Sequence, residues 1–412
     1  MAIVKPFRGY RPAKDLAERI AALPYDVYNR QEAKAEVERE PLSFLKIDRA
    51  ETQFPDEVST YADCVYEKAR ETLQDMIKKG QFVQDEEACF YIYELTMDGR
   101  SQTGIVGCAS IDDYLDGTIK KHENTRAEKE KDRIRHVDVT NMQTGPIFLA
   151  YHEDETINGI IAAVKEKDAV ADFVSPDGIR HRVWVVERDD RVRALAAAFN
   201  AIPALYIADG HHRCASAVKV GCKRREEHPG YNGSEEFNYF LSVLFADSEL
   251  KIMDYNRLIL DMNGLDKEGI LAAIAEKCDV EGPLKEAVRP AHKGEFGMYI
   301  GEDWFRLTLH EELRPDDPVE GLDVAVLQKE IIAPIFGIQD LKTDKRIDYV
   351  GGIRGLEELE RRVHTDAKLA FSMYPTDIQE LFTVADCHRL MPPKSTWFEP
   401  KLRSGLFLHE LG

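Results

Sequence analysis

Hydrophobic positions along the chain change their spacing from one segment to the next, and each spacing predicts an element. Apolar residues at helical intervals predict an amphipathic helix over 61–77. Two apolar runs, 88–95 and 103–111, flank the turn dipeptide Asp98-Gly99 and predict a β-hairpin. The N-terminal part of the chain is therefore expected to mix helices with strands.

Strands and helices alternate through the middle of the chain. The apolar pattern predicts strands at 145–149, 182–187, 204–208 and 239–245, and helices at 157–166, at 191–200 and from about Cys214. A further α/β region starts near residue 250, and no repeat or Gly/Ser spacer separates the parts. We expect a mixed α/β protein of closely packed domains, at about 1–150, 151–250 and 251–412, the last with a structured C-terminal strap.

Composition and charge narrow the class of protein. The 412 residues are 43% hydrophobic and carry a formal net charge of −20, which favours a folded chain and disfavours nucleic acid or an anionic membrane as partner. Anionic small molecules stay open, because a local pocket can bind phosphate on an acidic protein. There is no signal-peptide core and no apolar run near the ~20 residues of a membrane span. The seven cysteines lack C-x-x-C spacing, so we expect free thiols and a cytoplasmic protein.

The strongest candidate site is the sequence A-D-G-H-H-R at 208–213, between an apolar strand and a helix. Backbone N–H groups at the start of a helix bind anions, and Gly210 permits a sharp turn close to a ligand. Arg213 offers donors for phosphate, and Asp209 can hold Mg²⁺ or accept a proton. The alternative is a tight turn whose aspartate caps the next helix.

Two further segments are candidates. Glu123 and Arg126 begin the most charged stretch of the chain and can act as carboxylate and phosphate clamp, or belong to a solvated helix face. The C-terminal sequence 391–405 is either an anion-binding loop or a strap held by its aromatic residues. The cationic residues of this sequence that can bind an anionic substrate group are Lys394, Lys401 and Arg403.

Several common catalytic motifs are missing from the chain. It contains no G-x-x-x-x-G-K-[ST], G-x-G-x-x-G or G-x-S-x-G sequence, which excludes P-loop kinases, Rossmann dehydrogenases and α/β-hydrolases. His122-Glu123 is not followed by the second histidine of a zincin, because position 126 is an arginine.

The motifs together resemble a widespread bacterial and archaeal family long catalogued as a domain of unknown function. They are P-F-R, R-P and P-Y-D-V within 5–27, H-E-x-T with a downstream D-R at 122–133, I-A-D-G-H-H-R at 207–213 and M-P-P-K-S-T-W-F-x-P-K at 391–401. The D-G-H-H-R turn is similar to the nucleotide-binding turn of the ParB, sulfiredoxin and free-serine-kinase superfamily. This resemblance implies a ParB/sulfiredoxin-like nucleotide-binding core with additional α/β segments.

The resemblance also implies roles for single residues. Carried over by position, Asp209, Gly210, His211, His212 and Arg213 form a phosphate and metal loop for ATP or ADP, with Mg²⁺ at Asp209. Arg126 is a further phosphate ligand by its charge, and His212 is a candidate catalytic residue beside Asp209.

No motif fixes the catalytic base. Glu123 is the first candidate, and Asp26 and Asp209 are the others. The predicted function is a Mg²⁺- and nucleotide-dependent kinase that phosphorylates the hydroxyl of a small amino acid, free L-serine first, with a nucleotide and a small molecule as partners. The alternatives are a nucleotide-gated, ParB-like regulatory protein without efficient transfer and a phosphate-ester hydrolase. The sequence leaves open whether the protein forms a homodimer.

Overall fold

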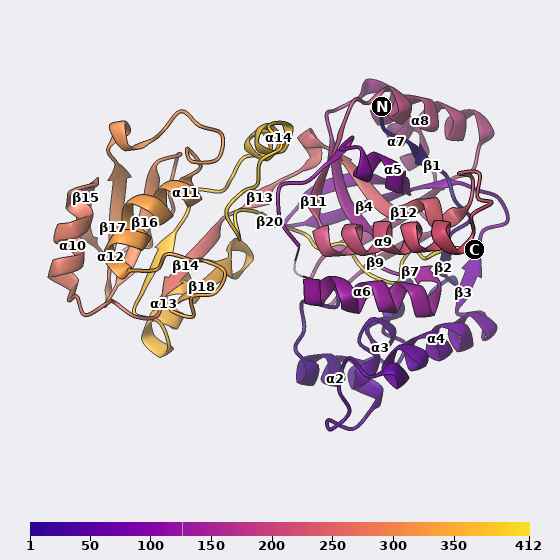
Figure 1. Ribbon diagram of the computed structural model, residues 1–412, viewed down its shortest axis with the longest axis horizontal. Coiled ribbons are helices and arrows are strands. Elements are labelled where there is room, and N and C mark those ends of the chain that lie inside the picture. The colour runs from indigo at the N-terminus through magenta and orange to yellow at the C-terminus, as the bar shows by residue number, and fades with distance from the viewer. Residues whose placement is uncertain (126) are drawn as a thin grey trace. The chain divides into compact units, whose positions relative to one another are not determined.

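The computed structural model describes residues 1–125 and 127–412, which form two compact units (Figure 1). Unit 1 contains residues 1–250 and 400–412, and unit 2 contains residues 251–399. Each unit combines helices with a β-sheet. The mixed α/β class predicted from the sequence is therefore confirmed.

The sheet of unit 1 has nine strands over the described residues, in the order β6-β11-β8-β12-β5-β4-β10-β9, with β1 paired to β5. The strands are β1 (Val4–Lys5), β4 (Phe90–Met97), β5 (Arg100–Ser110), β6 (Ile119–Lys120), β8 (Ile147–Tyr151), β9 (Ala171–Val174), β10 (Arg180–Val186), β11 (Leu205–Asp209) and β12 (Tyr239–Ala246). β6 runs parallel to β11 and β8 to β12, and the other pairs are antiparallel. Residues 1–150 and 151–250 thus contribute strands to one sheet.

Helices and the C-terminal segment cover the two faces of this sheet. Helices α5, α7, α8 and α9 pack on the face that carries Leu149 and Leu244. The opposite face carries Tyr91 and Tyr93, since side chains alternate along a strand, and Phe407 packs on both rings. The helices of unit 1 are α1 (Ala17–Ile20), α2 (Arg30–Arg39), α3 (Leu45–Asp48), α4 (Asp63–Lys78), α5 (Ile111–Leu115), α6 (Ala127–Thr140), α7 (Glu155–Lys165), α8 (Asp189–Ala201) and α9 (His211–Glu227).

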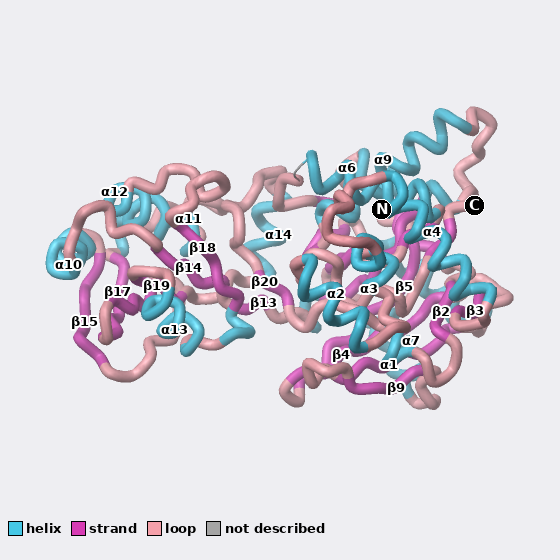
Figure 2. The backbone as a smooth tube through the Cα atoms, turned by 90° about the horizontal axis from the view of Figure 1, so that it is seen from below, coloured by secondary structure: helices cyan, strands magenta, loops and turns pink. Residues whose placement is uncertain are grey.

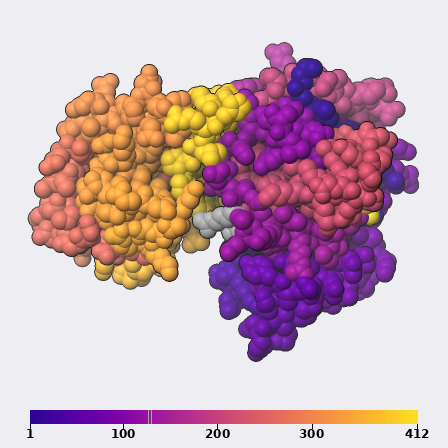
Figure 3. All heavy atoms as spheres, in the orientation of Figure 1, coloured from indigo at the N-terminus to yellow at the C-terminus, as the bar shows by residue number. Residues whose placement is uncertain are grey.

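Helix α6 connects the N-terminal helices to the sheet. α2, α3 and α4 share an apolar cluster that includes Phe44 and Leu73. α6 packs against both α4 and α9, and it lies side by side with α9 in two views of the chain (Figures 1 and 2). The space-filling view shows α6 and α9 as adjoining parts of one exposed face of unit 1 (Figure 3).

Local sequence explains several of these elements. Asp98 and Gly99 both have positive φ, 50° and 78°, as a two-residue hairpin turn between β4 and β5 requires. The helix predicted over 61–77 is confirmed as α4. The helix predicted from Cys214 begins earlier, at His211, because Gly210 occupies the N-cap position.

Unit 2 contains a six-stranded antiparallel sheet over the described residues, in the order β15-β17-β16-β19-β14-β18. Its strands are β14 (Tyr255–Ile259), β15 (Cys278–Leu284), β16 (Glu295–Ile300), β17 (Asp303–Leu309), β18 (Ile347–Gly351) and β19 (Leu369–Ser372), with the separate pair β13 (Ile252–Met253) and β20 (Trp397–Phe398). Its helices are α10 (Lys267–Ala275), α11 (Asp323–Leu327), α12 (Ala333–Phe336), α13 (Glu357–Thr365) and α14 (Ile378–Asp386).

Residues 400–412 return to unit 1 and are held there by backbone hydrogen bonds. Ser404 N donates to Ala22 O over 2.8 Å, and Gly405 N donates to Thr144 O over 3.1 Å. Two short strand pairs complete the unit: β2 (Tyr10–Pro12) with β3 (Phe82–Gln84), and β7 (Met142–Gln143) with β21 (His409–Glu410). Of the helices in residues 1–125 and 127–412, none has the length and apolar character that a membrane crossing needs.

Candidate functional site

The backbone of residues 209–213, called the D-G-H-H-R turn below, places N–H groups without an acceptor in the helix at the start of α9. Strand β11 ends at Asp209, and Gly210 adopts φ 91° and ψ 31° as the helix N-cap, a left-handed conformation that only glycine adopts without cost. The first helical hydrogen bond runs from Cys214 N to Gly210 O over 2.9 Å. The N–H groups of residues 211–213 therefore have no acceptor within the helix. Such a helix start attracts anions.

Two cations flank the carboxylate of Asp209. Lys401 Nζ lies 3.3 Å and Arg213 Nη2 lies 3.9 Å from Asp209 Oδ2, and Gly210 N donates to Asp209 Oδ1 over 2.8 Å. Burial alone would raise the pKa of Asp209, but Lys401 and Arg213 hold that pKa well below its ordinary value. The aspartate is therefore not the N-cap of α9 and instead positions two cations beside the start of the helix.

The geometry bears on whether Asp209 can hold a metal ion. Both of its oxygens are engaged, one by Gly210 N and the other by Lys401. No group of three or more His, Cys, Asp or Glu side chains in the described part of the chain is arranged to hold a metal. The turn does not fit a resident Mg²⁺ site, and Mg²⁺ that binds mainly through nucleotide phosphates needs no such site.

Two buried histidines lie beside the turn. The rings of His122 and His211 meet edge to face with centroids 4.5 Å apart, and they are 3% and 6% exposed. His122 Nδ1 and His211 Nε2 have no hydrogen-bond partner among the described residues. Glu123 Oε2 lies 3.9 Å from His211 Nδ1. Two buried imidazole nitrogens without a hydrogen-bond partner among the described residues thus lie beside the start of α9.

Burial makes both imidazoles poor bases. It lowers the pKa of His122 to about 4, against the nearby charge of Asp209, and together with His122 it lowers the pKa of His211 well below its ordinary value. Both rings are therefore neutral at pH 7.

The His122 pKa predicts how stability changes with pH. The folded pKa lies below the unfolded one, so the unfolded state binds the proton first and stability is lost as pH falls from about 6.5 toward 4. Between pH 7 and pH 5 this one group removes about 2 kcal/mol from the free energy of unfolding. Urea unfolding at pH 7 and pH 5 checks this prediction. The decrease in the free energy of unfolding between the two pH values is expected to be smaller in His122→Gln than in the unaltered protein, and unchanged in the exposed control His228→Gln. Equal losses in all three proteins would contradict it.

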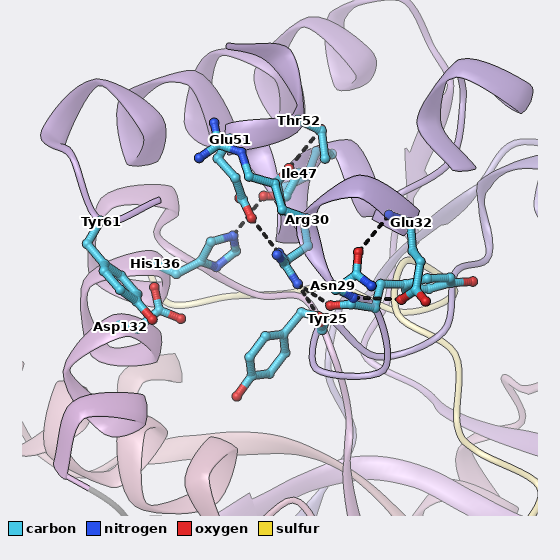
Figure 4. Close-up of polar contacts among 12 residues, drawn as sticks. Tyr25, Asn29, Arg30, Glu32, Ile47, Glu51, Thr52, Tyr61, Asp132 and His136 are labelled. Atoms are coloured by element: carbon cyan, nitrogen blue, oxygen red, sulfur yellow. Dashed lines mark hydrogen bonds and ion pairs between the residues drawn. The ribbon is translucent and has the colours of Figure 1, made fainter. Parts of the chain in front are cut away.

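A cavity of about 290 Å³ adjoins the turn and is called the Tyr25 cavity below. Its wall includes Tyr25, Asp26, Asp48, Asp132, Arg133 and His136. Figure 4 shows Tyr25, Tyr61, Asp132 and His136 arranged around this region, with the Glu51 side chain above them. A second, narrower space shares part of this wall and is lined by Arg213 and Gly145. The cavity and the D-G-H-H-R turn are thus neighbours within unit 1.

The two arginines of the Tyr25 cavity are already paired. Arg133 binds Asp132 over 2.8 Å, and its guanidinium lies 4.0 Å from the centre of the Tyr25 ring. Arg49 binds Glu51 over 2.5 Å and donates to the carbonyl oxygen of Tyr25 over 3.0 Å. These contacts fix the wall of the cavity.

The structure brings part of the predicted site together. Residues 209–213, Lys401 and Glu123 gather at the start of α9, and Asp26 lines the Tyr25 cavity. Arg126 lies outside the described residues. Lys394 lies in unit 2, with its ammonium 5.5 Å from the centre of the Tyr255 ring.

Arg403 has a different environment from Lys401. It is 3% exposed, binds Asp177 over 2.5 Å and donates to Ser175 Oγ over 3.0 Å. Its guanidinium also lies 3.3 Å from His181 Nε2. These contacts engage the side chain in anchoring residues 400–412 to the sheet.

Sequence reasoning missed the buried polar wall of the cavity, above all Asp48 and His136. Asp48 ends the four-residue helix α3, which carries no periodic signal. His136 belongs to the charged stretch that reads equally well as a solvated face. The available signal was the pair of motifs P-Y-D-V and D-R, whose Tyr25 and Arg133 stack on each other.

Comparisons with known proteins match a family over most of the chain. The family model described as "Protein of unknown function (DUF1015)" matches residues 4–325. Curated proteins give no match. A solved free serine kinase variant in complex with ADP shares 16% identity at a TM-score of 0.34, over 72% of this chain and 87% of that chain. SbnI with a C-terminal truncation, from Staphylococcus aureus, shares 10% sequence identity at a TM-score of 0.38. That match covers 71% of this chain and 82% of SbnI. At TM-scores below 0.5, similarity to these solved structures does not assign a function to this chain.

Proposed function

Since the chain belongs to the DUF1015 family, a family described without an activity, we propose its function from the chemistry of its own site. The protein is a nucleotide-dependent kinase that transfers a phosphoryl group to the hydroxyl of a small amino acid. Free L-serine, which becomes O-phosphoserine, is the first acceptor to test. ATP is the donor, and Mg²⁺ arrives with its phosphates.

One observation carries this proposal: the D-G-H-H-R turn places the N-terminus of α9, with its N–H groups that have no acceptor within the helix, and Arg213 beside Lys401. Phosphoryl transfer depends mainly on positioning and on neutralising the charge of the phosphates. Helix N–H groups, a guanidinium and an ammonium supply both. The neutral imidazoles of His122 and His211 add hydrogen-bonding nitrogens without adding charge.

We take Asp26 as the catalytic base among the three carboxylates that the sequence left open. Asp209 is paired with Lys401, and Glu123 lies beside His211, whereas Asp26 is exposed and lines the Tyr25 cavity. In the transfer step the acceptor oxygen forms the new P–O bond and its proton passes to the Asp26 carboxylate. The bond from the γ-phosphorus to the bridging oxygen breaks, and ADP leaves.

Acceptor-dependent release of ADP tests the proposal. Purified protein with ATP and Mg²⁺ is expected to form ADP when L-serine is added and not when L-alanine, which lacks the hydroxyl, is added. ADP formation at the same rate with both amino acids would indicate an ATPase. Nucleotide binding without any turnover would favour the alternative, a nucleotide-gated regulatory protein.

A further inference from the structure

The Tyr25 cavity contains one buried carboxylate that lacks a cationic partner, Asp48. Its side chain is 4% exposed. Asp48 Oδ1 accepts a hydrogen bond from Thr144 Oγ1 over 2.8 Å and lies 3.9 Å from His136 Nε2. Among the described residues, no Lys or Arg pairs with Asp48, and its other oxygen, Oδ2, accepts no hydrogen bond.

His136 does not neutralise this carboxylate. Its Nε2 lies 3.1 Å from the carbonyl oxygen of Ile47, which can only accept, so Nε2 carries the hydrogen and donates it. Burial, with the nearby charge of Arg133, lowers the pKa of His136, which keeps the imidazole uncharged at pH 7.

The cavity wall carries more carboxylates than cations. Arg133 is paired with Asp132 and Arg49 with Glu51, and Arg133 acts on Asp48 only at longer range. Of the two remaining carboxylates, Asp26 is exposed and Asp48 is buried, so Asp48 is the buried one without an ion pair to Lys or Arg among the described residues. A carboxylate buried without a counter-ion is costly. A cationic ligand in the cavity would remove that cost, whereas an anionic ligand would find both guanidinium groups engaged.

We propose that the Tyr25 cavity is the acceptor site and that it recognises the primary ammonium group of a small hydroxyl compound at Asp48. That the bound compound is the phosphoryl acceptor rests on the proposed kinase function, whereas binding of its ammonium group at Asp48 does not. The volume of about 290 Å³ lies at the lower end of ligand pockets, ~300–1,000 Å³, and suits a small molecule. The narrow space lined by Arg213 shares Tyr25, Arg133 and His136 with the cavity, so the cavity neighbours the arginine to which we assign phosphate binding.

Three compounds test this recognition on the unaltered protein. L-Serine carries an ammonium and a carboxylate, ethanolamine only the ammonium, and glycerate only the carboxylate, and all three carry a hydroxyl. Equilibrium binding is measured by calorimetry with ADP and Mg²⁺ present, so that no turnover is needed. Serine and ethanolamine are expected to bind, and glycerate is expected not to bind. Glycerate binding as tightly as serine would overturn the proposal.

The Asp48→Asn variant provides the second test, with Asp56→Asn as a surface control that makes the same change of charge. Removing one partner of a buried charge pair is expected to weaken serine and ethanolamine binding by at least about tenfold. ADP affinity is expected to stay unchanged in both variants. Unaltered serine affinity in a folded Asp48→Asn protein would overturn the proposal.

These measurements separate the inference from the proposed function. Asp48-dependent binding of serine and ethanolamine without phosphoryl transfer would support the ammonium site and refute the kinase. Transfer to serine with an unchanged KM in Asp48→Asn would support the kinase and refute the ammonium site. Transfer with a raised KM and an unchanged kcat in that variant supports both.

Discussion

Replacing Arg213 with alanine is expected to abolish detectable nucleotide binding and to lower phosphoryl transfer by about 10²–10³-fold. Arg213 lies across the D-G-H-H-R turn, with Nη2 3.9 Å from Asp209 Oδ2 and Nη1 donating to the carbonyl oxygen of Pro146. Arg213 belongs to the first turn of α9, and a guanidinium binds phosphate oxygens through two parallel hydrogen bonds. Thermal stabilisation by ADP and ATP measures the binding.

Two further variants make this result specific. Arg193→Ala removes an exposed arginine of α8 and is expected to leave nucleotide binding intact. Gly210→Ala keeps the guanidinium but places a Cβ about 3.0 Å from Arg213 Nε, at a residue with φ 91°, and is expected to weaken nucleotide binding as well. Full nucleotide stabilisation in a folded Arg213→Ala protein would show that the turn does not hold the phosphates.

Replacing Asp26 with asparagine is expected to lower kcat by about 10²–10⁴-fold, the usual contribution of a general base. The substitution keeps the size of the side chain and removes only the proton acceptor. ADP affinity and equilibrium binding of serine are therefore expected to stay unchanged. Single-turnover transfer from ATP to serine measures the rate of the chemical step.

Glu123→Gln is the matched comparison for the base. The Glu123 side chain is 45% exposed, with Oε2 3.9 Å from His211 Nδ1, so its loss is expected to leave most of the turnover. An active Asp26→Asn enzyme together with an inactive Glu123→Gln enzyme would assign the base to Glu123. The acceptor hydroxyl would then have to approach the phosphates from the His211 side of the turn.

Part of the fold and the site could be predicted because the signals are local. Asp98-Gly99 predicts its hairpin because both residues adopt positive φ, and the apolar run before Asp209 predicts β11. The D-G-H-H-R sequence marks a strand-to-helix turn because Gly210 adopts a left-handed conformation there. In contrast, the sequence analysis did not predict α2. Ala33 is the buried residue of this helix, so the segment has almost no apolar periodicity. Its start is defined instead by a capping box between Asn29 and Glu32.

The rest of the site depends on contacts between distant segments, which spacing does not report. Asp48 meets Thr144 from 96 residues away, and Lys401 meets Asp209 from 192 residues away. From the sequence, Lys401 and Arg403 are two equivalent cations of one loop. In the structure, however, the buried Arg403 side chain forms an ion pair with Asp177. Charge at a position is therefore predictable from sequence, but which opposite charge it meets is not.

Phosphorus NMR of the protein with ATP, Mg²⁺ and L-serine tests the central claim most directly, because it observes the phosphate after transfer. The proposed function predicts a new phosphomonoester resonance that grows with serine as ATP is converted to ADP, and that is absent with alanine or in the Asp26→Asn variant. Inorganic phosphate as the only new resonance, or an unchanged ATP spectrum, would contradict the proposed kinase.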